Sequence, residues 1–288
     1  MRRRLSIFLP LVVVLLAACS KQGDPTEPQL VMEGWIENGG HPIILLSESI
    51  TVENNKEISP KDLVNQLAKW AKVTVSNGEK EVVLTGMADS NYFPPYVFTT
   101  TRITGEVGKT YSVRVEYKDY VATAKTTIPK PVPLDKVYVK TVSKDSLCSV
   151  MCGFTDPPEK GNYYKVFTKT TGKDSHYHPS ALSSLSDETL KGYSEIFIYS
   201  TQRLLDFIDK PNLKVGDELW VKLYTMDEQA YEYWTNYEVM IASNVANTYY
   251  QNNMKSNVDG ALGYWNGYGV AGEVKLKLDF PDKTDNPQ

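Results

Sequence analysis

Apolar and polar residues alternate along several short segments in the first half of the chain, and this period of two is typical of half-buried β-strands. In Tyr111–Tyr117, for example, tyrosine and valine alternate with serine, arginine and glutamate. Asn38-Gly39 and Asn77-Gly78 each separate two such segments, and Asn-Gly steps favour tight hairpins. The pattern predicts about seven strands. They include Leu30–Ile36, Ile43–Ser47, Lys72–Ser76, Lys80–Thr85, Tyr111–Tyr117 and Val121–Ile128.

One helix is predicted to interrupt these strands. Ser59 is a capping residue, and Pro60 after it suits the first helical position. Apolar residues then recur at helical spacing and predict a buried face, formed by Leu63, Val64, Leu67 and Trp70. Short strands at this spacing favour an antiparallel sandwich of immunoglobulin-like type, which we assign to residues 29–129.

A proline-rich segment separates the two halves of the chain. Prolines at positions 129, 131 and 133 predict a stiff polyproline linker at residues 130–133. Strand-like segments resume beyond it, and they predict a second sandwich over residues 134–280, followed by a disordered tail at 281–288. The expected strands are Lys136–Thr141, Cys148–Phe154, Tyr163–Thr170, Glu195–Tyr199, Glu218–Tyr224 and Glu273–Leu278, and the expected helices are Thr201–Ile208 and Asp227 to about Ser243.

The chain begins with a segment typical of an export signal. Arg2–Arg4 are followed by the apolar run Leu5–Leu16, which is shorter than the roughly 20 residues that a membrane-spanning helix needs. Leu16-Ala17-Ala18-Cys19 resembles the bacterial lipobox. We therefore predict a lipoprotein signal peptide at 1–18, lipid attachment at Cys19 and a tether at 19–28. The alternative is an ordinary secretory cut nearby, but a cut before Cys19 would place bulky Leu16 where a small residue is preferred.

Lipid attachment would determine where the protein is found. Several acyl chains on one residue hold a soluble domain on a membrane far more firmly than a single chain does. Ser20, by resemblance to lipoprotein sorting rules, favours the outer membrane. Lys21–Asp24 match the acidic surface-export signals only weakly, so both the periplasmic and the surface-facing leaflet stay open.

Charge and composition narrow the class of protein. Loss of the three signal-peptide arginines leaves 28 basic against 35 acidic residues, and the net charge becomes −7 instead of −4. This acidic balance argues against nucleic acid as a partner, because phosphate binding needs a basic surface. The 19 tyrosines and five tryptophans suit sheet faces, interfaces and ligand sites alike.

Two cysteines follow Cys19. On an extended segment, Cys148 and Cys152 would lie about 13 Å apart, whereas a disulfide needs Cα atoms within about 7 Å. We expect two small buried apolar residues, although a bulge between them would permit a bridge.

Several motifs suggest chemistry but lack the required context. Gly267–Gly272 spells a dinucleotide fingerprint, yet a strand is expected after it where a nucleotide site needs a helix. His176 and His178 lack further histidine ligands nearby, so we expect a solvated loop between Thr170 and Leu185 and no metal site. The acidic pairs Asp187-Glu188, Asp217-Glu218 and Asp227-Glu228 are expected to be caps and solubilising groups.

The segment Asn244–Tyr268 is the best candidate for interaction. It carries large rings on a glycine-rich stretch, which suits stacking on a ligand or anchoring in an interface. Folding back as a plug over the sandwich is the alternative. The predicted ligand- or partner-binding residues are Tyr264, Trp265 and Tyr268.

Three segments together resemble one protein family. These are Val31–Ile36, then Asp156-Pro157-Pro158 with Gly161–Tyr164, and finally Gly260–Trp265. In this order they are similar to the Gram-negative lipoproteins grouped as domain of unknown function 4249. The resemblance spans nearly the whole mature chain and implies a partner, because genes of such lipoproteins typically lie beside TonB-dependent receptors. It supplies no catalytic residue.

The sequence therefore predicts a mostly β protein of two antiparallel β-sandwich domains, immunoglobulin- or fibronectin-like, with short helical insertions. We expect a lipid-anchored, non-enzymatic accessory of a TonB-dependent outer-membrane receptor for nutrient uptake, without cofactor or metal. An adhesin or structural envelope protein is the first alternative, because tandem sandwiches also suit stalks. A surface glycan hydrolase is the second.

Overall fold

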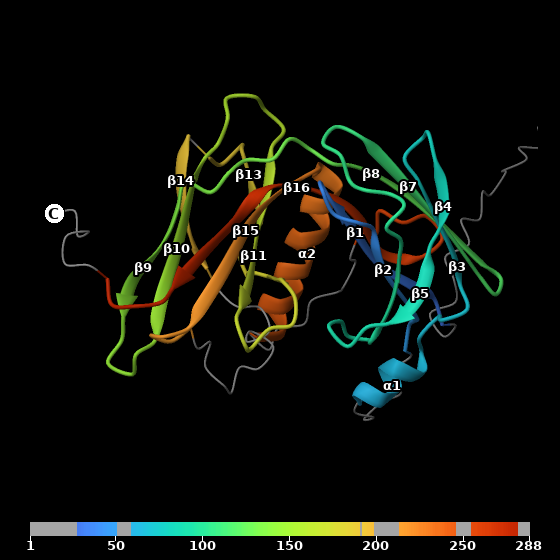
Figure 1. The fold of residues 1–288 in the computed structure, drawn as a ribbon, viewed down its shortest axis with the longest axis horizontal. Helices are drawn as coiled ribbons and strands as arrows, with labels where there is room; N and C mark the ends of the chain where they lie inside the picture. The colour runs from blue at the N-terminus through green and yellow to red at the C-terminus, as the bar shows by residue number, and fades with distance from the viewer. Residues whose placement is uncertain (1–27, 51–58, 191, 199–212, 246–254, 282–288) are drawn as a thin grey trace, which may run out of the picture.

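The computed structural model describes residues 28–50, 59–190, 192–198, 213–245 and 255–281 (Figure 1). The predicted signal peptide, Cys19, the helix expected at Thr201–Ile208 and residues 282–288 of the expected tail lie outside these ranges. Within them the protein is mostly β, with several antiparallel sheets and two helices, so the predicted fold class is confirmed.

A long sheet of nine strands runs through both halves of the molecule. Its order is β12-β11-β15-β16-β1-β2-β6-β5, and β13 also pairs with β11. The strands are β1 (Leu30–Glu37), β2 (Ile43–Glu48), β5 (Thr85–Ala88), β6 (Tyr96–Thr99), β11 (Tyr163–Thr170), β12 (His178–Pro179), β13 (Leu185–Ser186), β15 (Glu218–Met226) and β16 (Leu262–Lys277).

Two smaller sheets complete a pair of sandwiches on this long sheet. One has the order β4-β3-β7-β8 and lies on the right in Figure 1, and the other has the order β14-β10-β9 and lies on the left. The strands are β3 (Lys72–Ser76), β4 (Glu81–Val83), β7 (Thr110–Tyr117), β8 (Tyr120–Thr127), β9 (Lys136–Val142), β10 (Cys148–Thr155) and β14 (Tyr193–Ile198).

Each sandwich encloses its own apolar core. In the first, valines of β3 and β7 pack against Met32 and Ile36 of β1 and against Trp265 of β16. In the second, Val150 and Phe154 of β10 pack against β11 and β15. Alternate residues of each strand face the core because successive side chains of a strand point to opposite faces.

The strand β16 belongs to both sandwiches. Its first half pairs in parallel with β1, from Val31 opposite Leu262 to Glu37 opposite Tyr268, and its second half pairs antiparallel with β15. Within the pairing of β15 and β16, a bulge between Lys222 and Tyr224 shifts the register. The C-terminal strand thus completes the N-terminal sheet, and the predicted division of the chain at residues 130–133 stays a prediction.

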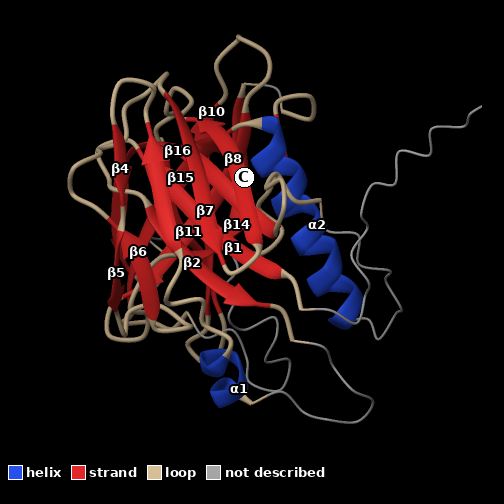
Figure 2. Cartoon of the chain, turned by 90° about the vertical axis from the view of Figure 1, so that its right-hand side faces the viewer, coloured by secondary structure: helices blue, strands red, loops and turns tan. Residues whose placement is uncertain are grey.

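Two helices accompany the sheets. The 18-residue helix α2 (Glu228–Val245) lies along one side of the strands in Figure 2. Helix α1 (Pro60–Asn65) starts at the expected cap, where Ser59 and Asp62 form a reciprocal capping box. The expected buried apolar face is wrong at Leu63 and Trp70, which are 37% and 92% exposed. The helix ends early because Gln66 and Ala68 form backbone hydrogen bonds with β2.

Cys148 and Cys152 are both free thiols on β10, and Cys152 is buried. Burial raises the pKa of the Cys152 thiol to about 12, so this thiol is uncharged at neutral pH. Both cysteines are therefore unbridged on one strand, as expected, but the expected burial is confirmed only for Cys152, because Cys148 is half-buried.

Candidate ligand-binding cleft

A cleft of about 600 Å³ lies on the long sheet, on the face that points away from the two cores. In β1, Met32 and Ile36 enter the N-terminal core, while Glu33, Trp35 and Glu37 line the cleft. The loop between β5 and β6, the segment before β12 and helix α2 supply its walls. The lining residues are mostly aromatic: Trp35, Tyr92, Phe93, Phe167, His176, Tyr177, His178, Tyr224, Tyr233, Trp234, Tyr237, Tyr264 and Tyr268.

Three stacked rings from neighbouring strands form the floor. Phe167 of β11 stacks on Tyr224 of β15 with ring centroids 4.2 Å apart, and Tyr224 stacks on Tyr268 of β16 at 4.5 Å. The Tyr268 hydroxyl accepts hydrogen bonds from the Trp234 indole at 2.9 Å and from the Asn266 amide at 3.0 Å. Because these groups are satisfied within the protein, the floor is fixed before any ligand arrives.

Helix α2 forms one wall of the cleft. Tyr233, Trp234 and Tyr237 face the strands from this helix. Asp227 precedes the helix, and its carboxylate accepts a hydrogen bond from the Ala230 amide at 2.9 Å. This is the capping role that the sequence predicted for the acidic pair at 227–228.

The mouth is lined by a chain of rings that includes both candidate histidines. Trp35 and Tyr92 have ring centroids 5.9 Å apart, Tyr92 and His176 5.1 Å, and His176 and His178 4.2 Å. The expectation of a solvated loop is wrong here, because both imidazoles are half-buried and His178 belongs to β12, which pairs with β11. Burial lowers the pKa of His178 to about 4 and lowers that of His176, so both rings are neutral at neutral pH.

Glu37 at the other end of the cleft is engaged by the protein itself. Its carboxylate accepts hydrogen bonds from Lys222 at 2.9 Å and from the Tyr224 hydroxyl. The Lys222 ammonium also lies 4.5 Å from the ring centroid of Tyr177. The hydroxyl of Tyr177 donates to Glu273 at 2.5 Å, and burial raises the pKa of Tyr177. In this part of the cleft, these polar side chains are therefore paired with one another.

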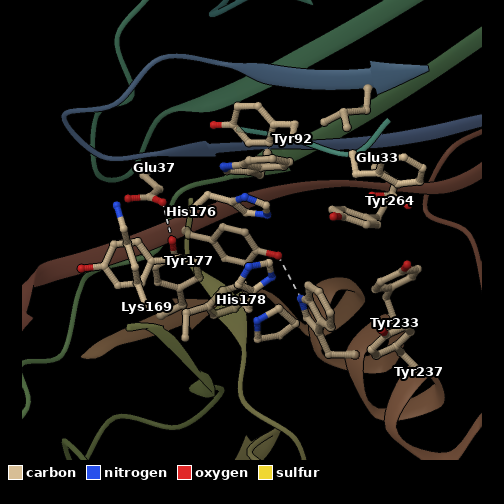
Figure 3. Close-up of a pocket in the computed structure, with 18 of the residues that line it drawn as sticks. Glu33, Glu37, Tyr92, Lys169, His176, Tyr177, His178, Tyr233, Tyr237 and Tyr264 are labelled. Carbon is tan, nitrogen blue, oxygen red and sulfur yellow. Dashed lines mark hydrogen bonds between the residues drawn. The ribbon is translucent and has the colours of Figure 1, made fainter. Parts of the chain in front are cut away.

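Glu33 differs from Glu37. It lies on the same face of β1, and among the described residues no group donates a hydrogen bond to its carboxylate or forms an ion pair with it. Its side chain is exposed to the open space of the cleft, and desolvation by the surrounding protein raises the pKa of the carboxyl. Figure 3 shows Glu33 beside Tyr264, with Tyr233 and Tyr237 across the gap on α2.

The described residues contain no group of three or more His, Cys, Asp or Glu side chains that would hold a metal ion. In the same part of the chain, no helix has both the length and the apolar character needed to span a membrane.

The structure separates the three site residues that the sequence indicated. Tyr264 and Tyr268 line the cleft, whereas Trp265 lies on the opposite face of β16, fully buried in the N-terminal core. The Trp265 indole donates a hydrogen bond to the Tyr111 carbonyl at 3.0 Å. The alternative of a plug is wrong for the segment from Leu262 onward, because this segment is a strand of the long sheet. Gly267–Gly272 lies inside this strand, without the helix that a dinucleotide site needs.

Sequence reasoning missed most of the cleft. One available signal was the polar and aromatic face of β1, where Glu33, Trp35 and Glu37 alternate with core residues. Another was the spacing of Tyr233, Trp234 and Tyr237, which places three rings near one face of α2.

Fold and site together define a mostly β protein with an aromatic cleft on its longest sheet. A family model described as "Domain of unknown function (DUF4249)" matches residues 20–273, so the chain belongs to that family. A search of the curated proteins finds no match. Among solved structures, a chain titled "Cytokine receptor complex - Crystal form 1A" aligns with 7% identity over 86% of this chain and 96% of that one, at a TM-score of 0.24.

Proposed function

We propose that this protein is a non-enzymatic, lipid-anchored lipoprotein of the outer membrane that binds a small nutrient ligand and assists a TonB-dependent receptor. The observation that carries the binding role is the preformed aromatic cleft, which contains one carboxylate without a partner among the described residues. A concave aromatic site with few polar groups is the usual form of a small-molecule site, and its volume lies within the common range of roughly 300–1,000 Å³.

The proposed anchor is Cys19. It ends a lipobox-like segment, and the region that matches the family model begins at the next residue. With Cys19→Ala, we expect intact-mass analysis to show loss of the lipid and cell fractionation to show release from the membrane. Cys148→Ala is the matched control, because this thiol lies on β10 and should leave both results unchanged. A wild-type protein that carries no fatty acid would refute the anchor.

The proposed partner is a TonB-dependent β-barrel receptor. Affinity purification of the tagged full-length protein from detergent-solubilised membranes, followed by mass spectrometry, is expected to recover such a receptor. The Cys19→Ala variant should recover much less of it, because a freed domain loses the high local concentration that a shared membrane provides. Repeated purification without any barrel protein would count against this partner and would favour an adhesin or structural role.

A further inference from the structure

The two carboxylates on the cleft face of β1 have opposite surroundings. Glu37 pairs with the Lys222 ammonium, which itself lies over the ring of Tyr177. On the same face of β11 as Phe167, the buried Lys165 pairs with Glu238 of α2, and its ammonium lies 5.4 Å from the ring centroid of Trp234. Twice, therefore, this region of the protein combines a carboxylate, a lysine ammonium and an aromatic ring.

The Glu33 corner has the same components except the cation. Tyr233 of α2 and Tyr264 of β16 have ring centroids 4.5 Å apart at 48°, and Tyr237 follows Tyr233 by one helical turn, across the cleft from Glu33. No lysine or arginine of the described residues forms an ion pair with Glu33. A carboxylate without a cation beside it attracts a positively charged group, and the faces of the neighbouring rings attract cations in addition.

We propose that this corner, formed by Glu33, Tyr233, Tyr237 and Tyr264, binds the ammonium group of a small organic ligand. The proposal deepens the proposed function, on which it rests, by naming the class of ligand. The carboxylate would supply the counter-charge and the three rings the walls, while the apolar part of the ligand would lie on the aromatic floor beside Phe167 and Tyr268.

An organic ammonium fits this corner better than a metal ion does. Calcium takes six to eight oxygen ligands and magnesium six, whereas the corner offers one carboxylate. The hydroxyls of Tyr233 and Tyr264 stay protonated, because burial raises the pKa of both. The walls therefore present ring faces and neutral hydroxyls, which suit a cation of low charge density.

The test compares three probes of similar size that differ in charge. They are 2-phenylethylamine, neutral 2-phenylethanol and anionic 3-phenylpropionate. Binding to the full mature protein in detergent is measured by calorimetry and by the fluorescence of Trp35 and Trp234, which line the cleft. For the wild type, we expect the amine to bind at least about tenfold more tightly than the alcohol, which corresponds to roughly 1.4 kcal/mol, and the carboxylate to bind weakest.

Variants then assign the preference to the corner. Glu33→Gln is expected to reduce the ratio of amine to alcohol affinity to about twofold or less, because it removes the counter-charge. Its melting temperature should stay that of the wild type, because Glu33 has no partner to lose among the described residues. Tyr237→Leu should weaken the amine more than the alcohol. The matched control is Glu81→Gln, which removes an exposed carboxylate from β4 and should change neither affinity.

The pH dependence gives an independent readout. The titratable groups that face Glu33 are Tyr264 on β16 and Tyr233 and Tyr237 on α2, all with raised pKa, and Glu37 on its own strand is paired with Lys222. Protonation of Glu33 should therefore dominate. The ratio of amine to alcohol affinity should be greatest above the raised pKa of Glu33, where the carboxylate is charged, and should fall as the pH drops through that pKa. Glu33→Gln should remove this pH dependence.

Three outcomes would overturn the inference. If the alcohol binds as tightly as the amine, or if Glu33→Gln keeps the preference for the amine, the cleft does not select ligands by positive charge. This inference then fails, while the proposed function stands. If none of the three probes binds, the inference fails together with the binding role of the cleft.

Discussion

At the scale of single residues, the buried pair of Lys165 and Glu238 fixes the wall of the cleft. Lys165 on β11 is fully buried and donates to the Ser180 carbonyl at 2.9 Å and to Glu238 on α2. Burial lowers the pKa of Lys165, since it disfavours the charged form. Glu238 also accepts a hydrogen bond from the Ser183 amide at 2.8 Å, so the pair joins the helix, β11 and the segment after β12.

Removal of one member of this pair should destabilise the protein strongly. Lys165→Met leaves the Glu238 carboxylate buried without a cation, and we expect the free energy of unfolding to fall by about 3–5 kcal/mol. The double variant Lys165→Met/Glu238→Leu should recover part of this loss, because both charges are then gone. Chemical denaturation measures all three proteins, with Lys169→Met on the same strand as the control. A loss below about 1 kcal/mol for Lys165→Met would show that the pair does not hold the helix.

At the scale of elements, β16 depends on glycine where it meets β1. Gly263 has a φ of +113°, and a Cβ atom built there would lie 1.9 Å from the Met32 carbonyl oxygen. Gly263→Ala is therefore expected to disrupt the parallel pairing with β1 and to cost at least about 3 kcal/mol, measured by thermal and chemical denaturation. Gly40→Ala, where the nearest contact is an ordinary 3.4 Å, should change stability by less than about 1 kcal/mol. Equal effects of the two substitutions would contradict the close approach of the strands.

The same strand explains what the sequence could and could not predict. Segments with strict alternation, such as Tyr111–Tyr117, were assigned correctly because their local pattern matches their burial. The stretch Leu262–Gly269 was not predicted as a strand, since its glycines weaken the strand pattern. Its glycines instead allow close backbone approach, and a Cβ atom at Gly269 would lie 2.3 Å from the Pro129 carbonyl oxygen. The need for glycine is imposed by residues more than a hundred positions away in the sequence, so the local sequence pattern does not predict it.

The cleft could not be predicted from the sequence for a related reason. Its rings come from β1, β11, β15, β16, α2, the loop between β5 and β6, and β12 with the segment before it, which lie far apart in the sequence. They meet because β16 pairs with both β1 and β15. Tyr264 and Tyr268 were identified because they lie in one short aromatic segment. Trp265 between them was assigned with them, although alternation along a strand sends it to the core. The capping role of Asp227, by contrast, is local and was predicted.

At the scale of the whole molecule, sharing β16 should couple the two sandwiches during unfolding. The N-terminal core includes Trp265, and seven residues of β1 pair with β16, so residues 28–133 by themselves lack part of their core and one neighbour of β1. We expect this fragment to show no cooperative thermal transition, whereas the full chain unfolds cooperatively.

A substitution in the C-terminal core tests the same coupling in the intact chain. Val221→Ala removes buried apolar volume from the C-terminal core, and it should lower the unfolding midpoint reported by groups in both sandwiches, since a shared sheet transmits the loss. If instead the 28–133 fragment melts cooperatively, and Val221→Ala lowers only the transition of the C-terminal half, the two sandwiches are independent units. The division at residues 130–133 would then describe stability as well as sequence, and β16 would be a contact between domains rather than a strand that both of them need.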